Sequence, residues 1–300
     1  LLYIKIILMN VSKKINICLI RNDKMGDMIL TLPIIKAIKD SNSNTKITVV
    51  CSNKNSFLCE EAPFVDEYSI FDKKDNLLSK IKFLKKFRKS SFDFIFNFSQ
   101  DIKTFFLLLI GKSINKSSLI YLTRYGNSKF SKVFQRLITR LYGFDNIIIN
   151  RNEFYKKKLN FHQTEIMSQL VNKKINIKKP NFFHLIPRKK NFKEIFQKRI
   201  LIHLSDRWID HKYSENMFLN LLSKVEESYG KLYLTTDQLS QKSFKKIYQL
   251  YEKFNDSELH KVNKSNQSII ILDKLNFKNW RNAIINSKLV ITYECGCVHV

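Results

Sequence analysis

Short runs of apolar and β-branched residues alternate along the chain with longer segments whose apolar residues recur at helical spacing. The pattern begins at residues 15–20, a run of strand length. A polar turn follows at residues 21–27, and apolar positions then continue at helical spacing as far as Ile38. Strand, turn and helix in this order open a parallel α/β sheet, in which ligands bind beyond the carboxyl ends of the strands. We therefore expect the turn to lie at a binding site.

The same alternation predicts further elements in both halves of the chain, and it indicates parallel sheets covered on both faces. The expected strands are residues 46–51, 68–71, 92–96, 117–122, 199–204, 231–235, 268–272 and 288–292. The expected helices are residues 55–61, 76–89, 102–110, 130–142, 153–171, 214–229, 240–254 and 278–286.

A change of character at residues 172–198 marks the expected domain boundary. This stretch is basic, has little periodicity and contains Pro180 and Pro187. We predict two domains, residues 1–180 and residues 181–300. A length of 300 residues is sufficient for two domains with cores of their own.

The charge balance is strongly basic, with 53 Lys and Arg against 26 Asp and Glu, a formal charge of +27. Such an excess favours nucleic acid, an anionic membrane or an acidic substrate as partner. However, the lysines are spread along the whole chain, and Lys, Asn, Ile and Phe are residues that A/T-rich codons favour. The densest basic run, residues 80–89, fits either an amphipathic helix on an anionic membrane or a solvated helix with an apolar side in the core.

Cysteine usage and hydropathy point to a cytoplasmic protein. Five cysteines form no secreted-type framework in a chain of this length, so reduced thiols are expected. No apolar run approaches the roughly 20 residues that a membrane-spanning helix requires.

The first turn contains candidate chemistry at Gly26 and Asp27. Gly26 permits a tight backbone path and leaves amide N–H groups at the start of the helix. The helix dipole keeps Asp27 ionised, and an ionised carboxylate at a cleft serves as a general base. An Asp in the first helical turn is also a common cap, and spacing alone favours that simpler role.

Residues 21–33 resemble the opening motif of glycosyltransferase family 9, the heptosyltransferases of lipopolysaccharide core synthesis. That motif is a strand, an R/K-x-D/S-x-x-G-D turn and a helix starting close to L-T-x-P. The resemblance implies that Asp27 is the general base and that Arg21, Asp23 and Gly26 shape the loop on the acceptor side. Residues 62–67, Ala-Pro-Phe-Val-Asp-Glu, are similar to the N-P-x-V-D-E turn of the same family.

Two loops of the second half resemble the donor-binding loops of that family. In residues 203–214, Lys212 matches a Lys that contacts the donor diphosphate, while Ser205 stands where the family has a small residue. Hydroxyl and cationic groups at a helix N-terminus, here capped by Ser214, suit phosphate oxygens. The alternative is a polar connection in which Trp208 packs against its own domain.

The second loop, residues 292–299, is similar to the D-T-G-P-x-H segment of the family. Gly296 and His299 match it by position, whereas Glu294, Cys295 and Cys297 replace Asp, Thr and Pro. Donor binding is therefore expected at Ser205, Lys212, Glu294, Cys295, Gly296 and His299. The alternatives are weaker, because a zinc site here lacks a fourth ligand and the usual C-x₂-C spacing, and a nucleophilic cysteine lacks an oxyanion hole.

The resemblance implies a GT-B type α/β fold, two Rossmann-like domains facing a central cleft, with a C-terminal domain that looks truncated at Val300. It implies an inverting transfer of heptose from ADP-heptose onto a lipopolysaccharide core or related glycan. No cofactor or metal is expected, since the sequence has no Asp-x-Asp motif. The expected location is the cytoplasm, with peripheral contact at the cytoplasmic face of the inner membrane.

Two other functions remain open from the sequence. The first is a non-catalytic basic protein that binds nucleic acid or an anionic surface, although the chain has no helix-turn-helix, zinc-finger or RNP-type signature and specific nucleic-acid binding is not expected. The second is another sugar-nucleotide enzyme such as an epimerase. That enzyme would call for a G-x-G-x-x-G turn, whereas residues 21–27 contain a single Gly.

Overall fold

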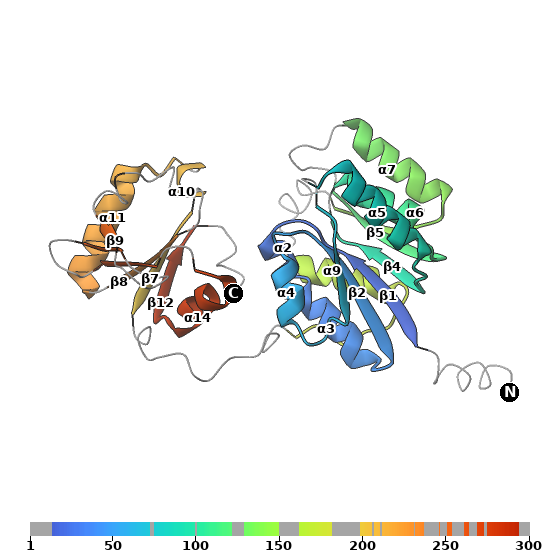
Figure 1. Cartoon of the computed structure of the whole chain (residues 1–300), viewed down its shortest axis with the longest axis horizontal. Coiled ribbons are helices and arrows are strands. Elements are labelled where there is room, and N and C mark those ends of the chain that lie inside the picture. The colour runs from blue at the N-terminus through green and yellow to red at the C-terminus, as the bar shows by residue number, and fades with distance from the viewer. Residues whose placement is uncertain are drawn as a thin grey trace. The chain divides into compact units, whose positions relative to one another are not determined.

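The computed structural model describes residues 14–72, 75–99, 101–121, 129–149, 162–181, 199–205, 207–210, 212–230, 232–236, 246, 251–253, 261–263, 269–272 and 275–293. The chain divides into two compact units, residues 1–188 and 189–300. The boundary predicted after residue 180 falls slightly earlier. Each unit is an α/β structure built on its own sheet (Figure 1).

The sheet of the first unit has six strands in the order β3-β2-β1-β4-β5-β6, and every pair in it is parallel. The register places Ile17 of the central strand beside Ile47 on one side and Phe94 on the other. The sixth strand was not predicted, because its five residues follow a helix with only a short turn between them. The strands are β1 (Ile15–Ile20), β2 (Thr45–Cys51), β3 (Glu67–Ile70), β4 (Phe94–Asn97), β5 (Asn115–Tyr121) and β6 (Asp145–Ile149).

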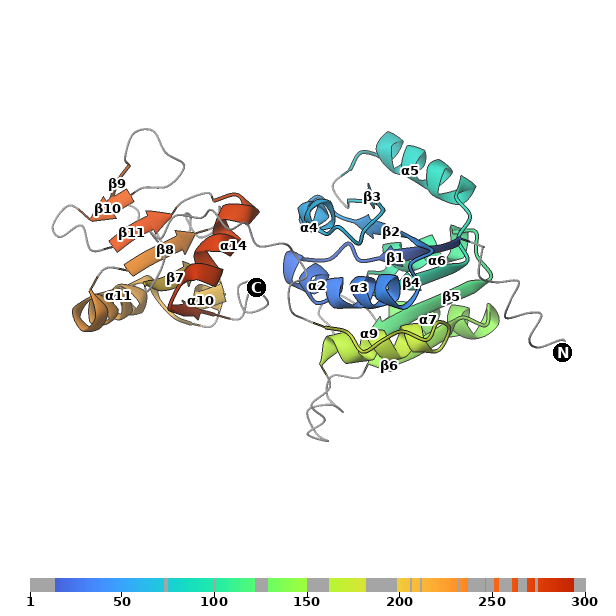
Figure 2. The same ribbon diagram turned by 90° about the horizontal axis from the view of Figure 1, so that it is seen from below.

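Helices cover both faces of this sheet, because successive residues of each buried strand point to opposite sides. Cys18 and Ile20 of β1 join a core cluster with side chains of α5, α6 and α7, whereas α3 and α9 lie on the other face (Figures 1 and 2). The helices are α2 (Met25–Ile29), α3 (Leu32–Ser41), α4 (Ser56–Glu61), α5 (Leu77–Lys89), α6 (Ile102–Ile110), α7 (Lys129–Leu141) and α9 (Gln163–Asn172).

The helix expected after the first turn is two helices, α2 and α3. Pro33 is the second residue of α3 and has no N–H to donate, so a continuous helix cannot run through it. Gly26 lies inside α2, and the positive-φ glycines among the described residues are Gly143 and Gly230. The tight turn expected at Gly26 is therefore ordinary helix. Most of the first half of the helix predicted at residues 153–171 lies outside the described residues.

The second unit has the strand order β12-β7-β8-β11-β10-β9. Its first four strands are parallel, but β10 pairs antiparallel with both β11 and β9. Helices α11 and α14 cover opposite faces of the sheet (Figures 1 and 2). The elements are β7 (Ile200–Leu204), α10 (Arg207–Asp210), α11 (Glu215–Tyr229), β8 (Leu232–Thr236), β9 (Tyr251–Lys253), β10 (Lys261–Asn263), β11 (Ile269–Leu272), α14 (Phe277–Asn286) and β12 (Leu289–Thr292).

The prediction of a helix at residues 240–254 was wrong at its end, where the chain forms β9. Pairing of β9 with β10 supplies backbone hydrogen bonds that outweigh a helical spacing of apolar residues. Within the same range Lys246 is helical, and the other residues before Tyr251 lie outside the described part. The sheet of this unit is consequently mixed rather than wholly parallel.

Candidate active site

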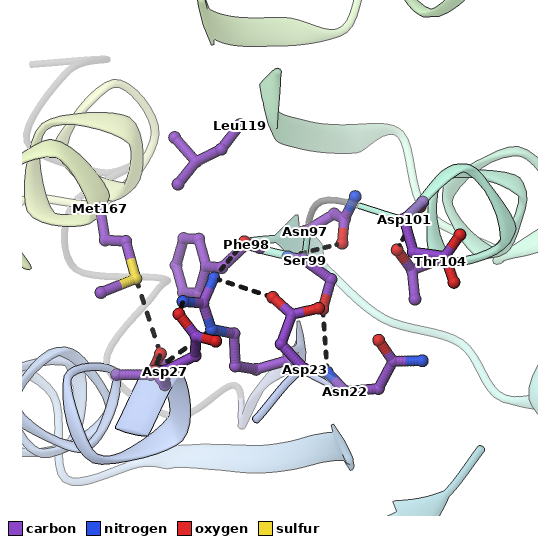
Figure 3. A network of polar contacts seen from close by, with 12 residues as sticks. Asn22, Asp23, Asp27, Asn97, Phe98, Ser99, Asp101, Thr104, Leu119 and Met167 are labelled. Atoms are coloured by element: carbon purple, nitrogen blue, oxygen red, sulfur yellow. Dashed lines mark hydrogen bonds and ion pairs between the residues drawn. The ribbon is translucent and has the colours of Figure 1, made fainter. Parts of the chain in front are cut away.

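A fully buried arginine organises the carboxyl end of the central strand in the first unit. Arg21 follows β1 directly, and none of its side chain is exposed. Its Nη2 donates to Oδ1 of Asp27 over 3.0 Å, and its Nε donates to the Asp27 carbonyl over 3.2 Å. Nη1 donates to the carbonyl of Phe98 and lies 3.5 Å from Oδ2 of Asp23 (Figure 3). One cation thus joins the first turn to the end of β4.

Asp27 is held at this edge without serving as a helix cap. It is the third residue of α2, whose N-cap is Lys24 with no side-chain cap bond. The carboxylate is 15% exposed, and Thr31 Oγ1 donates to the Asp27 carbonyl over 2.8 Å. The Asp27 side chain is oriented by Arg21 and remains open to solvent, which is the arrangement that a general base requires.

Asn55 holds the same turn from the opposite side, a role that was not predicted. The side chain is fully buried, and its Nδ2 donates to the carbonyl of Arg21 over 3.0 Å. Its Oδ1 accepts from the backbone N–H of Ser52 over 2.8 Å. The sequence signal was available, since Asn55 and Ser52 follow directly after β2, where polar residues lie at the binding edge of a parallel sheet.

A second polar chain runs from the carboxyl ends of β1 and β4 to the middle of β5. Ser99 Oγ accepts from the backbone N–H of Asn22 over 2.9 Å, and the Ser99 N–H donates to Asn97 Oδ1 (Figure 3). Asn97 Nδ2 then donates to Ser118 Oγ. Asn22 Oδ1 is buried and has no hydrogen-bond partner among the described residues. An unsatisfied buried acceptor is costly to the folded state.

In the second unit, the described part of the predicted donor loop is a short helix closed by a Schellman motif. The N–H of Lys212 donates to the carbonyl of Ile209, and the N–H of Tyr213 donates to that of Trp208. Lys212 occupies the position that glycine favours and has a φ of +66°. The Trp208 and Tyr213 rings, 5.1 Å apart, make the apolar contact typical of this motif.

Trp208 is packed into its own unit, as the structural alternative for this loop predicted. Its indole Nε1 donates to the carbonyl of His203 over 3.0 Å, and its ring meets Phe218 edge to face. Ser205 directly follows β7, and its buried Oγ has no hydrogen-bond partner among the described residues. Packing of Trp208 therefore fixes the loop and leaves the side chain of Lys212 exposed.

The remaining predicted donor residues lie outside the described part of the chain. These are Glu294, Cys295, Gly296 and His299, together with Cys297 of the zinc and nucleophile alternatives. The strand that leads to them is present, because β12 ends at Thr292 beside His203 of β7. The structure therefore brings Arg21, Asp23 and Asp27 into contact in the first unit, with Gly26 in the same helix as Asp27, and places Ser205 and Lys212 in one loop of the second.

Two further findings concern the described thiols and acids. Cys18 is buried, and its burial raises the pKa of the thiol far above the usual range. No group of three or more His, Cys, Asp or Glu suited to a metal ion occurs among the described residues. Likewise, no helix in the described part of the chain is long and apolar enough to cross a membrane.

A cavity of about 600 Å³ lies elsewhere, between the end of α5 and the strands of the first unit. Its lining includes Asn16 and Lys46, near the amino ends of β1 and β2, and Lys86 of α5. Because ligands of parallel sheets bind at the carboxyl ends of the strands, this cavity is not the candidate site.

Comparison with known proteins gives one sequence match of limited extent. No family model matches the chain. A stretch of 82 residues, 27% of the chain, is 30% identical to a Haemophilus influenzae protein named "Putative glycosyltransferase". The match spans about a quarter of that protein, 24% of its length.

Solved structures are similar over nearly the whole chain. A glycosyl transferase family 9 structure from Veillonella parvula has a TM-score of 0.66 at 13% identity, over 97% of this chain and 79% of that one. The E. coli heptosyltransferase WaaC with ADP scores 0.64 at 11% identity, over 95% and 83%. A UDP-N-acetylglucosamine 2-epimerase scores 0.50 at 12% identity, over 93% and 74%.

The likeness that residues 21–33 show to glycosyltransferase family 9 is therefore confirmed in the fold. The transferases score above the epimerase, and the chain spans about four fifths of each of the two transferase structures. The chain has an α/β fold of the GT-B type, the fold of the heptosyltransferases.

Proposed function

We propose that the protein is an inverting glycosyltransferase that moves heptose from ADP-heptose onto a lipopolysaccharide core or a related glycan. The observation that carries the proposal is the pair of Arg21 and Asp27. A partly exposed carboxylate, oriented by a buried guanidinium, stands at the carboxyl end of the central strand. It does so in a fold shared with a heptosyltransferase that was solved with ADP.

Asp27 acts as the general base in this proposal. Its carboxylate takes the proton of an acceptor hydroxyl while that oxygen attacks the anomeric carbon of the donor sugar. The new carbon–oxygen bond forms as the bond to the nucleoside diphosphate breaks on the opposite face, so the configuration inverts. Arg21 touches the base rather than the substrates, and it is a positioning residue.

Lys212 stabilises the charge that develops on the departing diphosphate. Its conformation supports this role, because a left-handed backbone costs a residue with a side chain about 1 kcal/mol more than it costs glycine. Left-handed backbone at a residue other than glycine is found most often at ligand-binding and active sites. Ser205, Glu294, Cys295, Gly296 and His299 complete the donor site by their likeness to the family loops. Lys212 and His299, with the helix N-terminus expected after Gly296, take the place of a divalent metal.

The acceptor lies against the first unit in this proposal. Asp23 lies in the turn, where its carboxylate contacts Arg21, and Gly26 lies in α2 directly after this turn. A lipopolysaccharide acceptor is made at the inner membrane, so the protein works in the cytoplasm at that surface.

Calorimetric titration with ADP-heptose, ADP and a panel of UDP- and GDP-sugars tests the donor. Selective binding of the ADP compounds that weakens in Lys212→Ala supports the proposal. Selective binding of another nucleotide reassigns the sugar, and a folded chain that binds no nucleotide contradicts the proposal.

A further inference from the structure

One helical layer of the first unit gathers eight of the large apolar side chains that the described residues leave in solvent, namely Leu77, Leu78, Ile81, Phe106, Ile110, Val133, Leu137 and Leu141. Helices α5, α6 and α7 pack their inner residues, among them Phe83, Phe105 and Ile138, onto the core cluster beneath one face of the sheet. Their outer surfaces are therefore directed away from the sheet (Figures 1 and 2). Large exposed apolar patches on soluble proteins mark interaction sites.

Helix α5 presents leucines beside lysines on its outer surface. Leu77 and Leu78 are 72% and 70% exposed, and Ile81 lies one turn further along. Lys82 and Lys85 extend the same surface and are exposed. The spacing of Leu78, Ile81, Lys82 and Lys85 keeps these side chains on one side of the helix. Exposed apolar groups at the start of α5 are therefore followed by cationic groups on the same side of the helix.

Helix α7 repeats the arrangement. Val133, Leu137 and Leu141 are spaced four residues apart, and they are 65%, 53% and 68% exposed. Arg136 and Arg140 flank this apolar stripe and are exposed as well. Between the two helices, α6 adds exposed apolar area of its own.

The charge on the layer has a single sign. The three helices together contain eleven Lys or Arg and no Asp or Glu. A second copy of the chain placed against this face would bring like charges together, which disfavours self-association. Duplex nucleic acid would leave the exposed leucines and valine without an apolar partner, whereas a lipid bilayer supplies both headgroup charge and hydrocarbon.

We infer that the outer surface of α5, α6 and α7 docks onto an anionic phospholipid bilayer. The lysines and arginines contact the headgroups, and the exposed leucines enter the boundary between headgroups and acyl chains. The inference stands on exposure and charge alone. It does not rest on the proposed transfer reaction, and vesicle binding is measured without any donor.

Vesicle flotation of the full chain tests this surface. We expect binding to vesicles of phosphatidylcholine with 30% phosphatidylglycerol (about one lipid in three), little binding to phosphatidylcholine alone, and release by high salt. The variant Lys82→Gln/Lys85→Gln/Lys89→Gln should bind about a hundredfold more weakly, since each cation near the surface contributes roughly fivefold. Leu78→Ser and Leu137→Ser should each weaken binding about tenfold.

Matched control variants have substitutions of the same kind at exposed positions outside α5, α6 and α7. Lys178→Gln/Lys179→Gln/Lys224→Gln removes three exposed lysines, and Met217→Ser removes an exposed apolar side chain from α11. Both controls should bind like the wild type. Equal loss in the controls, or equal binding to neutral vesicles, would overturn the inference. The inference would also be overturned if the chain bound no vesicles but bound duplex DNA through the α5 lysines.

Discussion

The guanidinium of Arg21 donates to Asp27 Oδ1 over 3.0 Å from a position with no exposed surface. This contact distinguishes Asp27 from an ordinary helix acid, because α2 gains no cap from it. The cation is shared, since Asp23 and the Phe98 carbonyl contact the same group. Substitutions of the two residues should consequently have different effects. Replacing Arg21 should lower stability, and replacing Asp27 should lower activity.

Arg21→Lys should destabilise the first unit by about 1–3 kcal/mol, since the ammonium group of lysine cannot replace the planar guanidinium fork and leaves the Phe98 carbonyl and the partly buried Asp27 carboxylate without donors. Chemical denaturation measures this as a lower midpoint. Arg88→Lys, on the exposed surface of α5, is the matched control and should change the free energy of unfolding very little. Equal stability of the two variants would show that the buried network contributes nothing.

Asn55→Ala should lower the free energy of unfolding by about 1–3 kcal/mol, because the carbonyl of Arg21 and the N–H of Ser52 lose their buried partner. Asn53→Ala is a control two residues away with an exposed side chain, and it should be near neutral. The same denaturation series compares them. A loss as large in Asn53→Ala would mean that the loop, rather than the Asn55 amide, is sensitive.

Asp66 links stability to pH. Burial raises the pKa of this carboxyl, but hydrogen bonds from Lys39 Nζ and the Ile47 N–H outweigh that effect and lower the pKa below its usual range. The stabilisation is complete above the unfolded pKa of about 4 and is lost as the pH falls through the folded value.

Asp66→Asn should therefore cost about 1 kcal/mol at pH 7, a modest figure because the pair is partly exposed, and nothing at about pH 2. Denaturation curves between these pH values measure the difference. Asp40→Asn, which removes an exposed acid paired with Lys36, should show a smaller and flatter effect. A difference that does not depend on pH would exclude the ionised contact as its cause.

Lys212→Gly separates the backbone of the donor loop from its charge. Glycine accepts the left-handed conformation, so the variant should be as stable as the wild type or more stable by up to about 1 kcal/mol. Its affinity for ADP should nevertheless fall about tenfold or more, because the ammonium group is lost. Thermal unfolding and ADP titration give both values, and unchanged ADP affinity would remove Lys212 from the donor site.

Hydropathy spacing predicted most of the fold. Strands such as β1 and β7 are short, β-branched and buried, so local sequence and tertiary burial agree. The wrong prediction falls where strand pairing, and not local sequence, determines the structure. Residues 251–253 were predicted as helix but form β9, which is held by its antiparallel pairing with β10. Pro33 has no backbone N–H, so the sequence itself indicated a break in the helix at this point. The division of the expected helix into α2 and α3 was nevertheless not predicted.

The candidate site was predicted only in part. A sequence motif identifies the turn from Arg21 to Asp27. Asn55 follows a predicted strand, which marks it as a polar residue of the binding edge, but the residue that it contacts lies 34 positions away and could not be predicted from that signal. The same is true of Ser99, which meets Asn22 from 77 residues away. Such partners become visible only when the strand order is known.

The most direct test of the account is sugar transfer by Asp27→Asn, measured with ADP-heptose and a lipopolysaccharide core acceptor, with Asp40→Asn as control. The wild type and the control should transfer heptose. Asp27→Asn should remain folded and bind ADP normally, yet transfer about 10²–10⁴-fold more slowly, as expected for loss of a general base. Full activity of Asp27→Asn, in a preparation whose wild type is active, would contradict the central claim.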